Sequence, residues 1–286
     1  MSLGAHMSIA GGTPLAAERG GAFRCTAIQI FTKNGNQWAE REVTPEEGRA
    51  FREAMARHGV EVALAHDSYL INLAAPAAPL RKRSLHAFVG EVRRCAALGI
   101  PFLVFHPGAH VGEGERAGIG RVSRSLRESL KRTEGLPVVL AIETTAGQGS
   151  SLGWTFEHLR DLIDGAGAGP RLGVCLDTCH VHASGRDLST EGGVARCLED
   201  FDRIVGLERL CAFHLNDCKK PAGCRVDRHE HIGRGTIGLA GFRALAREKR
   251  IAPLPKVLET PKGTDPATGR AWDAVNLERL RRLGLR

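Results

Sequence analysis

The sequence predicts an α/β protein built as a closed (β/α)₈ barrel, in one domain that spans residues 1–286. Three observations predict this fold. Short runs rich in Val, Ile, Leu and Ala recur along the whole chain, helical patterns separate them, and the composition does not break anywhere. Apolar strands that alternate with helices are typical of a parallel sheet covered by helices. Eight such units in 286 residues favour a closed barrel over an open, doubly wound sheet.

Eight apolar runs are predicted as buried strands, because each is short and continuous rather than amphipathic at helical spacing. They cover residues 3–7, 27–33, 62–67, 102–107, 138–144, 172–178, 210–217 and 256–260.

The segments between these runs carry helix signals. Thr44 is placed as an N-cap, Pro45 occupies the first helical position, Glu47 completes a capping box, and this helix should end at Gly59. A second stretch, residues 80–99, repeats apolar residues at helical spacing and also closes on glycine. Further helices are expected at residues 115–134, 155–164, 193–205, 239–249 and 272–284.

Net charge and targeting signals limit the classes of protein to which this chain can belong. The 40 basic and 32 acidic residues give a net charge of +8, which suits a polyanionic partner but does not by itself identify nucleic acid. The opening MSLGAHMSIAGG lacks the features of a signal peptide, and no apolar run reaches the length of a membrane span. We expect a cytoplasmic protein with no membrane partner. The eight cysteines form no CxxC pair, so we expect free thiols, and we do not expect Cys175 and Cys179 to bind zinc.

Side chains of the metal-ligand type end the predicted strands. In a barrel these strand ends converge on one face, where barrel enzymes build their active sites. A single strand-end histidine usually has a structural role, but many carboxylates and imidazoles gathered within a few ångströms are costly without cations. The sequence therefore predicts a metal centre among His6, Lys33, His66, Asp67, His106, Glu143, Asp177, His180, His214, Asp217 and Glu259.

The ligand types narrow the choice of metal. Imidazole with carboxylate suits Zn²⁺, with Mn²⁺ or Fe²⁺ possible, and argues against Mg²⁺ or Ca²⁺. More than four candidate ligands imply more than one ion, and closely spaced ions suit phosphoryl transfer. The segment VDRHEHIGRGTIG, residues 226–238, adds Asp227, His229 and His231 at alternate positions, and it carries arginines. Cations would repel these arginines unless an anion such as a phosphodiester lay between them.

Several strings in this order resemble endonuclease IV, the family of zinc-dependent apurinic/apyrimidinic (AP) endonucleases of DNA repair. They are LGAHMSIAGG, FTKNGNQW, HDSYLINLAAP, FHPGAH, IETTAGQGSSLG, GVCLDTCHVHASGRDL, HLNDCKKPAGCRVDRHEHIGRGTIG and VLETPKG, and together they cover nearly the full chain.

The resemblance implies a TIM barrel with three zinc ions. Carried over by motif, the ligands form three sets, of which Glu143 belongs to two: His66, His106 and Glu143; Glu143, Asp177, His214 and Glu259; and His180, Asp227 and His229. The implied reaction is hydrolysis of the phosphodiester 5′ to an abasic site by a hydroxide that Glu143 orients, which leaves a 3′-hydroxyl and a 5′-deoxyribose phosphate. Removal of blocking groups from DNA 3′ ends is also implied.

The implied partner is double-stranded DNA that contains abasic sites or blocked 3′ ends, bound by a monomer. Tyr69, with Leu70 beside it, matches the side chain that the family inserts at the lesion. Asn36 stands where some members carry a DNA-inserting arginine, so that contact departs from the pattern. The motif does not require His231, and we expect His6, His110 and His182 to be structural or to support ligands. The candidate phosphate contacts are Lys33, Lys219, Lys220, Arg225, Arg228 and Arg234.

Two other functions are compatible with a barrel of this kind. A sugar isomerase or epimerase could use Glu143, Asp177, His214 and Glu259, but it would leave the remaining ligand candidates and the basic loops without a purpose. A non-catalytic DNA-damage binding protein would be expected to lack metal ligands, yet every position that the family pattern requires is filled.

Overall fold

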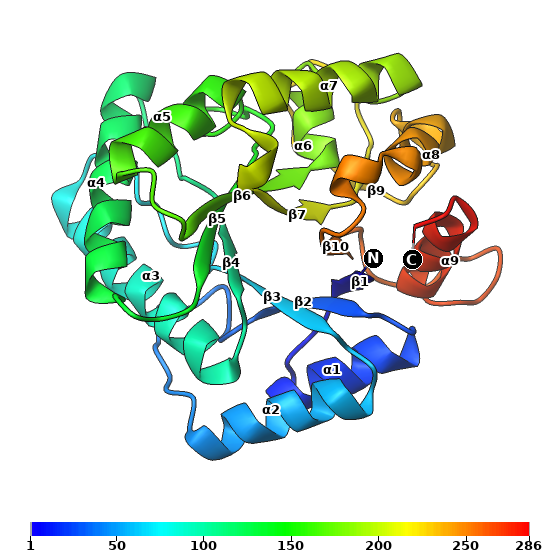
Figure 1. Cartoon of the computed structure of the whole chain (residues 1–286), viewed down its shortest axis with the longest axis horizontal. Coiled ribbons are helices and arrows are strands. Elements are labelled where there is room, and N and C mark those ends of the chain that lie inside the picture. Colours follow the sequence, from blue (N-terminus) through cyan, green and yellow to red (C-terminus); the bar gives the residue numbers. More distant parts are fainter. Residues whose placement is uncertain (1, 286) are drawn as a thin grey trace.

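The computed structural model describes residues 2–285 and shows a closed barrel of eight parallel strands ringed by helices (Figure 1). Neighbouring strands follow the order β1-β10-β7-β6-β5-β4-β3-β2, so each strand pairs with the next one in the barrel and β1 closes the ring against β2. Every predicted strand is confirmed. The barrel strands are β1 Leu3–His6, β2 Ala27–Phe31, β3 Val62–His66, β4 Phe102–Phe105, β5 Val139–Glu143, β6 Leu172–Asp177, β7 Leu210–His214 and β10 Lys256–Leu258.

The helices predicted from sequence are also confirmed, with ends that shift by at most two residues. The Thr44 side chain caps its helix as expected, because it accepts a hydrogen bond from the Glu47 backbone N–H at 3.2 Å. These helices are α2 Pro45–Arg57, α3 Ala78–Leu98, α4 Glu115–Arg132, α5 Phe156–Ala166, α7 Glu191–Ile204, α8 Gly238–Arg247 and α9 Trp272–Arg282.

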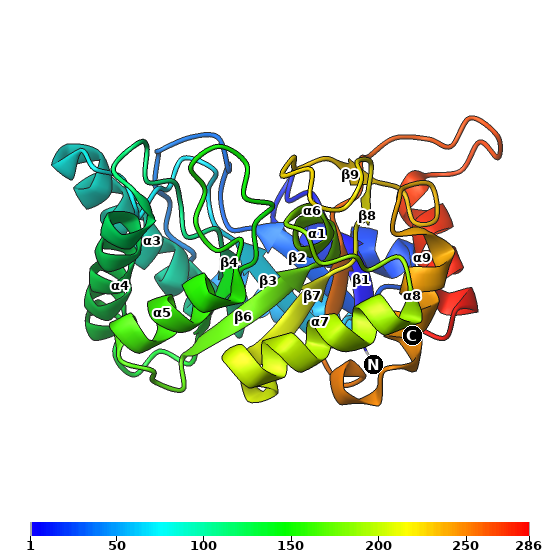
Figure 2. The same ribbon diagram turned by 90° about the horizontal axis from the view of Figure 1, so that it is seen from above.

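Two α-helices and two short strands were not predicted. The helices are α1 Thr13–Ala22 and the short α6 Thr178–Ala183. The strands, β8 Asp217–Cys218 and β9 His229–Glu230, form an antiparallel hairpin outside the barrel. Seen from the side, α6, β8 and β9 lie with the long loops at the end of the barrel where the strands finish (Figure 2).

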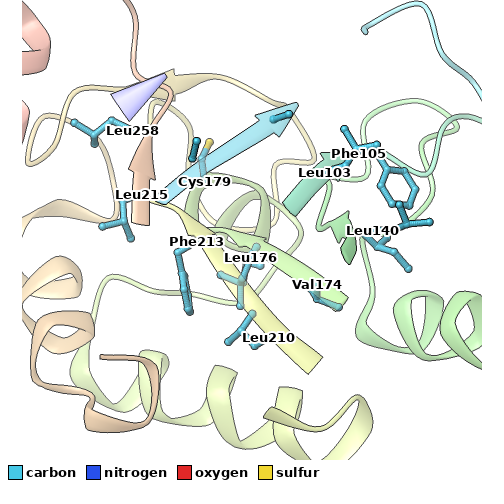
Figure 3. Close-up of a cluster of buried hydrophobic side chains, with 14 of the residues drawn as sticks. Leu103, Phe105, Leu140, Val174, Leu176, Cys179, Leu210, Phe213, Leu215 and Leu258 are labelled. Carbon is cyan, nitrogen blue, oxygen red and sulfur yellow. The ribbon is translucent and has the colours of Figure 1, made fainter. Parts of the chain in front are cut away.

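Successive strand residues alternate between two cores, as the period of two in a β-strand requires. The outward side chains, which include Leu140, Val174, Leu176 and Phe213, pack beneath the surrounding helices (Figure 3). The inward side chains form a separate small cluster that fills the barrel: Ala27, Leu64, Val104, Ala141, Cys175, Ala212 and Val257. The interior of the barrel is therefore filled by side chains and is not a pore. These seven inward residues form an apolar floor beneath any site at the ends of the strands.

The cysteines and the helices give two further findings. All eight cysteines are free thiols, as expected. Among residues 2–285, no helix is long and apolar enough to cross a membrane.

Candidate metal centre

The polar layer of the site lies one inward step beyond the apolar floor. Because side chains alternate along a strand, the residue two positions after each floor residue also points into the barrel. That step leads from Ala141 to Glu143 on β5 and from Ala212 to His214 on β7. The same rule yields one polar residue for each floor residue: Gln29, His66, His106, Glu143, Asp177, His214 and Glu259.

Glu143 is the centre of this layer and has no solvent exposure. Its Oε2 lies 3.0 Å from His66 Nε2 and 3.1 Å from His106 Nε2. Its Oε1 lies 2.8 Å from His214 Nδ1 and 3.3 Å from His180 Nδ1. Four imidazoles from four different βα units thus face one buried carboxylate, which is the arrangement of a bridging ligand.

Three groups of ligand atoms surround Glu143, and within each group the atoms lie within 4.8 Å of one another. Their membership is the same as in the three ligand sets implied by the family resemblance. The groups are His66, His106 and Glu143; Glu143, Asp177, His214 and Glu259; and His180, Asp227 and His229. The ligand atoms of Asp177, Cys179 and His229 also lie within 4.8 Å of one another, and this combination shares residues with the second and third groups. Contact with the Cys218 thiol and burial raise the pKa of Cys179, which disfavours the thiolate form that binds metals.

The electrostatics of the site favour cations. Burial would raise the pKa of Glu143, but His214 and His106 beside it hold that pKa well below its ordinary value. Burial would lower the pKa of His180, but the Asp177, Asp227 and Glu143 carboxylates outweigh burial and raise it. The site therefore favours the ionised form of Glu143 and the protonated form of His180. A divalent cation can replace such a proton, as metal binding to histidine and carboxylate usually does.

Individual contacts also fit a metal. Among residues 2–285, His106 Nε2 is buried and finds no hydrogen-bond partner, although Glu143 is beside it. His229 Nε2 and His180 Nε2 face each other at 3.4 Å, and Asp227 Oδ2 lies 3.1 Å from the same His180 atom. Two ring nitrogens and a carboxylate that converge on one point suit a transition-metal ion better than a hydrogen bond. The residues present therefore fit the implied group.

Comparison with known proteins identifies the family. A family model described as a xylose isomerase-like TIM barrel matches residues 15–282. A curated relative named probable endonuclease 4, from Geobacter sulfurreducens, is 50% identical over 98% of this chain and 94% of its own. The chain belongs to the endonuclease IV family. The crystal structure of endonuclease IV from Thermus thermophilus superposes with a TM-score of 0.86 at 36% identity, covering 99% of this chain and 98% of that one.

The expectations of a TIM barrel and of an enzyme of the endonuclease IV family are thereby confirmed. A solved D-psicose 3-epimerase is also similar, with a TM-score of 0.71, and the match covers 99% of this chain and all of that one. Its identity is only 13%, so this likeness shows the shared fold alone. The family is metal-dependent, and the three ligand groups agree with that property.

In this endonuclease IV family member, most residues predicted to contact DNA are exposed. Tyr69 is 65% exposed, and its ring stands edge-on to Phe31 with centroids 5.2 Å apart. A cavity of about 290 Å³ opens beside it, and its lining includes Tyr69, His106, His180 and Asp227. Leu70 is half-buried, whereas the remaining exposed candidates are Asn36, Lys219, Lys220, Arg225, Arg228 and Arg234.

Lys33 is placed differently from the expectation. It is 4% exposed, its ammonium donates a hydrogen bond to the Gln37 carbonyl, and Glu40 lies 4.0 Å away. These contacts hold the Lys33 side chain within its own loop. Because its charge is already paired and buried, Lys33 is not a free phosphate contact.

Two polar residues that sequence analysis missed hold the ligands in place. Gln29, on β2, lies 2.8 Å from His214 Nε2 and donates to Glu259 Oε1 at 2.6 Å. Asn216 donates to Asp177 Oδ2 at 2.6 Å, and its own Oδ1 accepts from the Glu259 backbone N–H at 2.8 Å. Such outer partners fix the orientation of ligands and tune their affinity for metal. An isolated polar residue inside the apolar run AIQIF was the available signal for Gln29.

Other strand-end candidates have structural roles. The buried Asp217 carboxylate accepts hydrogen bonds from the backbone N–H groups of Gly233, Gly235 and Ile237, so it orders the loop that carries Arg234. His231 stacks on Trp272 with ring centroids 3.7 Å apart and does not join a ligand group among the described residues. His6 supports the site, because its Nδ1 lies 3.4 Å from the Glu259 carboxylate.

Proposed function

We propose that this protein is a DNA-repair endonuclease that hydrolyses the phosphodiester 5′ to abasic sites and leaves a 3′-hydroxyl and a 5′-deoxyribose phosphate. We also propose that it trims blocked 3′ ends, because the same phosphodiester chemistry applies to both substrates. The observation that supports the proposal most is the single buried carboxylate, Glu143, shared between two ligand groups with a third group 3.3 Å away at His180. Family membership agrees with it.

Three zinc ions are the proposed cofactor, one for each ligand group. Imidazole and carboxylate donors match zinc, and Mn²⁺ or Fe²⁺ could substitute. Bound ions supply a nucleophile at neutral pH and stabilise the charge that develops on a phosphoryl group and on its leaving oxygen.

The side chains of this chain then have distinct tasks. Glu143 is ionised and fully buried, so it can accept a hydrogen bond from an attacking water and orient that water towards phosphorus. Asp227, from a loop, and His229, from β9, come from outside the barrel strands, so they can approach a bound phosphate from another direction than the strand-end ligands. Gln29 and Asn216 keep the carboxylates of Glu259 and Asp177 in fixed positions, which lowers the reorganisation needed during the reaction.

Selectivity for a damaged site follows from the surroundings of Tyr69. An abasic nucleotide stacks poorly, so its extrusion from the duplex costs less than extrusion of an intact nucleotide. The exposed Tyr69 ring borders the cavity next to His106 and Asp227 and can occupy the space left in the duplex. Lys219, Lys220, Arg225, Arg228 and Arg234 are exposed and are the proposed phosphate contacts, and Leu70 and Asn36 are further proposed DNA contacts.

A duplex with one tetrahydrofuran abasic analogue, incubated with the zinc-loaded monomer, tests the proposal. We expect a single nick 5′ to the analogue, a product that a polymerase can extend from its 3′-hydroxyl, and loss of nicking after chelation. An undamaged duplex of the same sequence is the control. Failure to nick the abasic strand, or epimerisation of a ketohexose at an enzymatic rate, would contradict the proposal.

A further inference from the structure

The loop that carries Asp227 is held only partly by the β8–β9 hairpin. Cys218 pairs with His229, and the ladder continues for one more step, because the Lys219 N–H donates to the Arg228 carbonyl at 2.9 Å. His229 is thus fixed by sheet pairing. Asp227 lies beyond the ladder in the Asp227 loop, defined as residues 219–228, and its side chain is 42% exposed. A metal ligand in such a position needs other contacts to keep it oriented.

Those contacts come from the β5–α5 connection, residues 144–155. The backbone N–H of Asp227 donates to the Gln148 side-chain carbonyl at 3.1 Å. Two residues earlier, the guanidinium carbon of Arg225 lies 4.0 Å from the centre of the Trp154 ring. A cation over the face of an indole is the most favourable cation–π geometry. The β5–α5 connection, which begins just after Glu143, therefore contacts the Asp227 loop at two points.

Trp154 is itself held in a fixed orientation. Its indole N–H donates to Glu115 Oε1 at 3.0 Å, at the first residue of α4. The Trp154 side chain packs on Gly147, where an added Cβ would lie 3.0 Å from Trp154 Cγ, and where φ is +76°. Glycine adopts this φ without steric strain and, because it lacks a Cβ, also allows this close packing. The ring is therefore a rigid platform rather than a loose surface side chain.

Arg225 adopts a backbone conformation that depends on such support. Its φ is +53°, in the left-handed region that non-glycine residues rarely adopt. Its backbone N–H donates to the Ala183 carbonyl at the end of α6, at 2.9 Å. Strained conformations persist where the surrounding contacts over-determine them, and they are common at functional sites.

We infer that Gln148 and the Trp154–Arg225 stack form a clamp of positioning residues, which holds Asp227 against His180 and His229 to complete the third ion site. The inference rests on the proposed three-ion function and deepens it. Asp227 Oδ2 lies 3.1 Å from His180 Nε2, and Oδ1 lies 3.4 Å from His229 Nε2. Without the clamp, part of the free energy of zinc binding would be needed to order the Asp227 side chain. The third ion should then be held less tightly than the other two.

Zinc binding to metal-depleted protein, measured by competition with a chromogenic chelator of known affinity, tests the clamp. Removal of the outer partners of metal ligands typically lowers metal affinity by about 10- to 100-fold. We expect Gln148→Ala and Trp154→Ala to weaken one of the three ions by about tenfold or more and to leave the other two unchanged. Trp154→Phe keeps an aromatic face under Arg225 and should stay near the wild-type affinity. Excess zinc should restore nicking in these variants.

A matched control is available in the same molecule. The Arg83 guanidinium carbon lies 4.4 Å from the centre of the Trp38 ring, a similar stack between α3 and a different loop. Trp38→Ala should leave all three zinc affinities unchanged. If Trp154→Ala unfolds the chain, the exposed Gln148 decides the question through Gln148→Ala. Wild-type affinity for all three ions in Gln148→Ala and in folded Trp154→Ala would overturn the clamp, whereas wild-type protein that binds fewer than three ions would overturn the proposed function.

Discussion

Replacement of Glu143 by glutamine changes one charge at the point where the ligand groups meet. Glutamine has nearly the same shape and keeps one acceptor oxygen, so the perturbation is mainly electrostatic. Glu143 is fully buried and lies 2.8 to 3.3 Å from nitrogens of His214, His66, His106 and His180. Removing one member of a buried charge pair costs about 3 to 5 kcal/mol. At about 1.36 kcal/mol per factor of ten, the expected loss of zinc affinity is roughly 150- to 5,000-fold.

Because Glu143 belongs to two ligand groups, two ions should weaken together while the third group retains its own ligands. Zinc titration followed by elemental analysis measures the affinity, and nicking of an abasic duplex at fixed zinc measures the activity. Glu128→Gln, on the exposed face of α4, is the matched control and should behave as wild type. A Glu143→Gln protein that binds zinc and nicks at wild-type levels would refute the bridging role.

Three further predictions follow from charge, shape and burial. Double substitution of Lys219 and Lys220 by alanine should reduce the slope of log binding constant against log salt by about 0.9 for each phosphate that is no longer neutralised; an unchanged slope in a fluorescence-anisotropy titration would remove them from the interface. Tyr69→Ala should lower the preference for abasic over undamaged duplex about tenfold, because stacking of a base on an aromatic side chain is worth about 1 to 3 kcal/mol; equal preference in both proteins would argue against insertion. Lys256 is 1% exposed, and burial lowers its pKa from 10.5 to about 8. The unfolded chain therefore binds more protons between these two pKa values, so wild type should gain up to about 2 kcal/mol relative to Lys256→Met as pH rises from 7.5 to 9.5. A pH-independent difference in urea unfolding would contradict this.

The barrel could be predicted from sequence because its signals are local. Each buried strand is a short apolar run, and helices such as α2 carry their own cap and stop residues. Helix α1 was missed because TPLAAERGGA contains two glycines that normally disfavour helix. The structure explains them: a Cβ added at Gly20 would lie 2.6 Å from Ile28, and one added at Gly21 would lie 2.7 Å from His58. These glycines allow close packing, which is a tertiary requirement that local propensity does not record.

The short elements near the site were missed for a related reason. Helix α6 has six residues, too few for a helical repeat to be visible, and it begins where Asp177 caps it by accepting from the His180 N–H at 2.8 Å. The hairpin of β8 and β9 joins two-residue strands separated by ten residues. Neither produces a periodic pattern in the sequence.

The ligand candidates could be predicted because strand ends in a barrel converge, but strand register had to be seen to separate ligands from neighbours. Counting two residues beyond Ala27 leads to Gln29, which touches His214 and Glu259. Lys33 lies beyond the end of β2, and its ammonium is bound within its own loop. Sequence alone placed both on one strand, and the isolated polar position within the apolar run AIQIF was the available sign that Gln29 points inward.

The dependence of nicking on bound zinc tests the central claim most directly. Metal-depleted protein is titrated with zinc while zinc per chain and the rate of abasic-duplex nicking are recorded on the same samples. The three ligand groups predict that nicking is absent without metal and reaches its maximum as bound zinc approaches three ions per chain. Full nicking by protein that holds no metal, or no nicking at saturating zinc, would contradict the account.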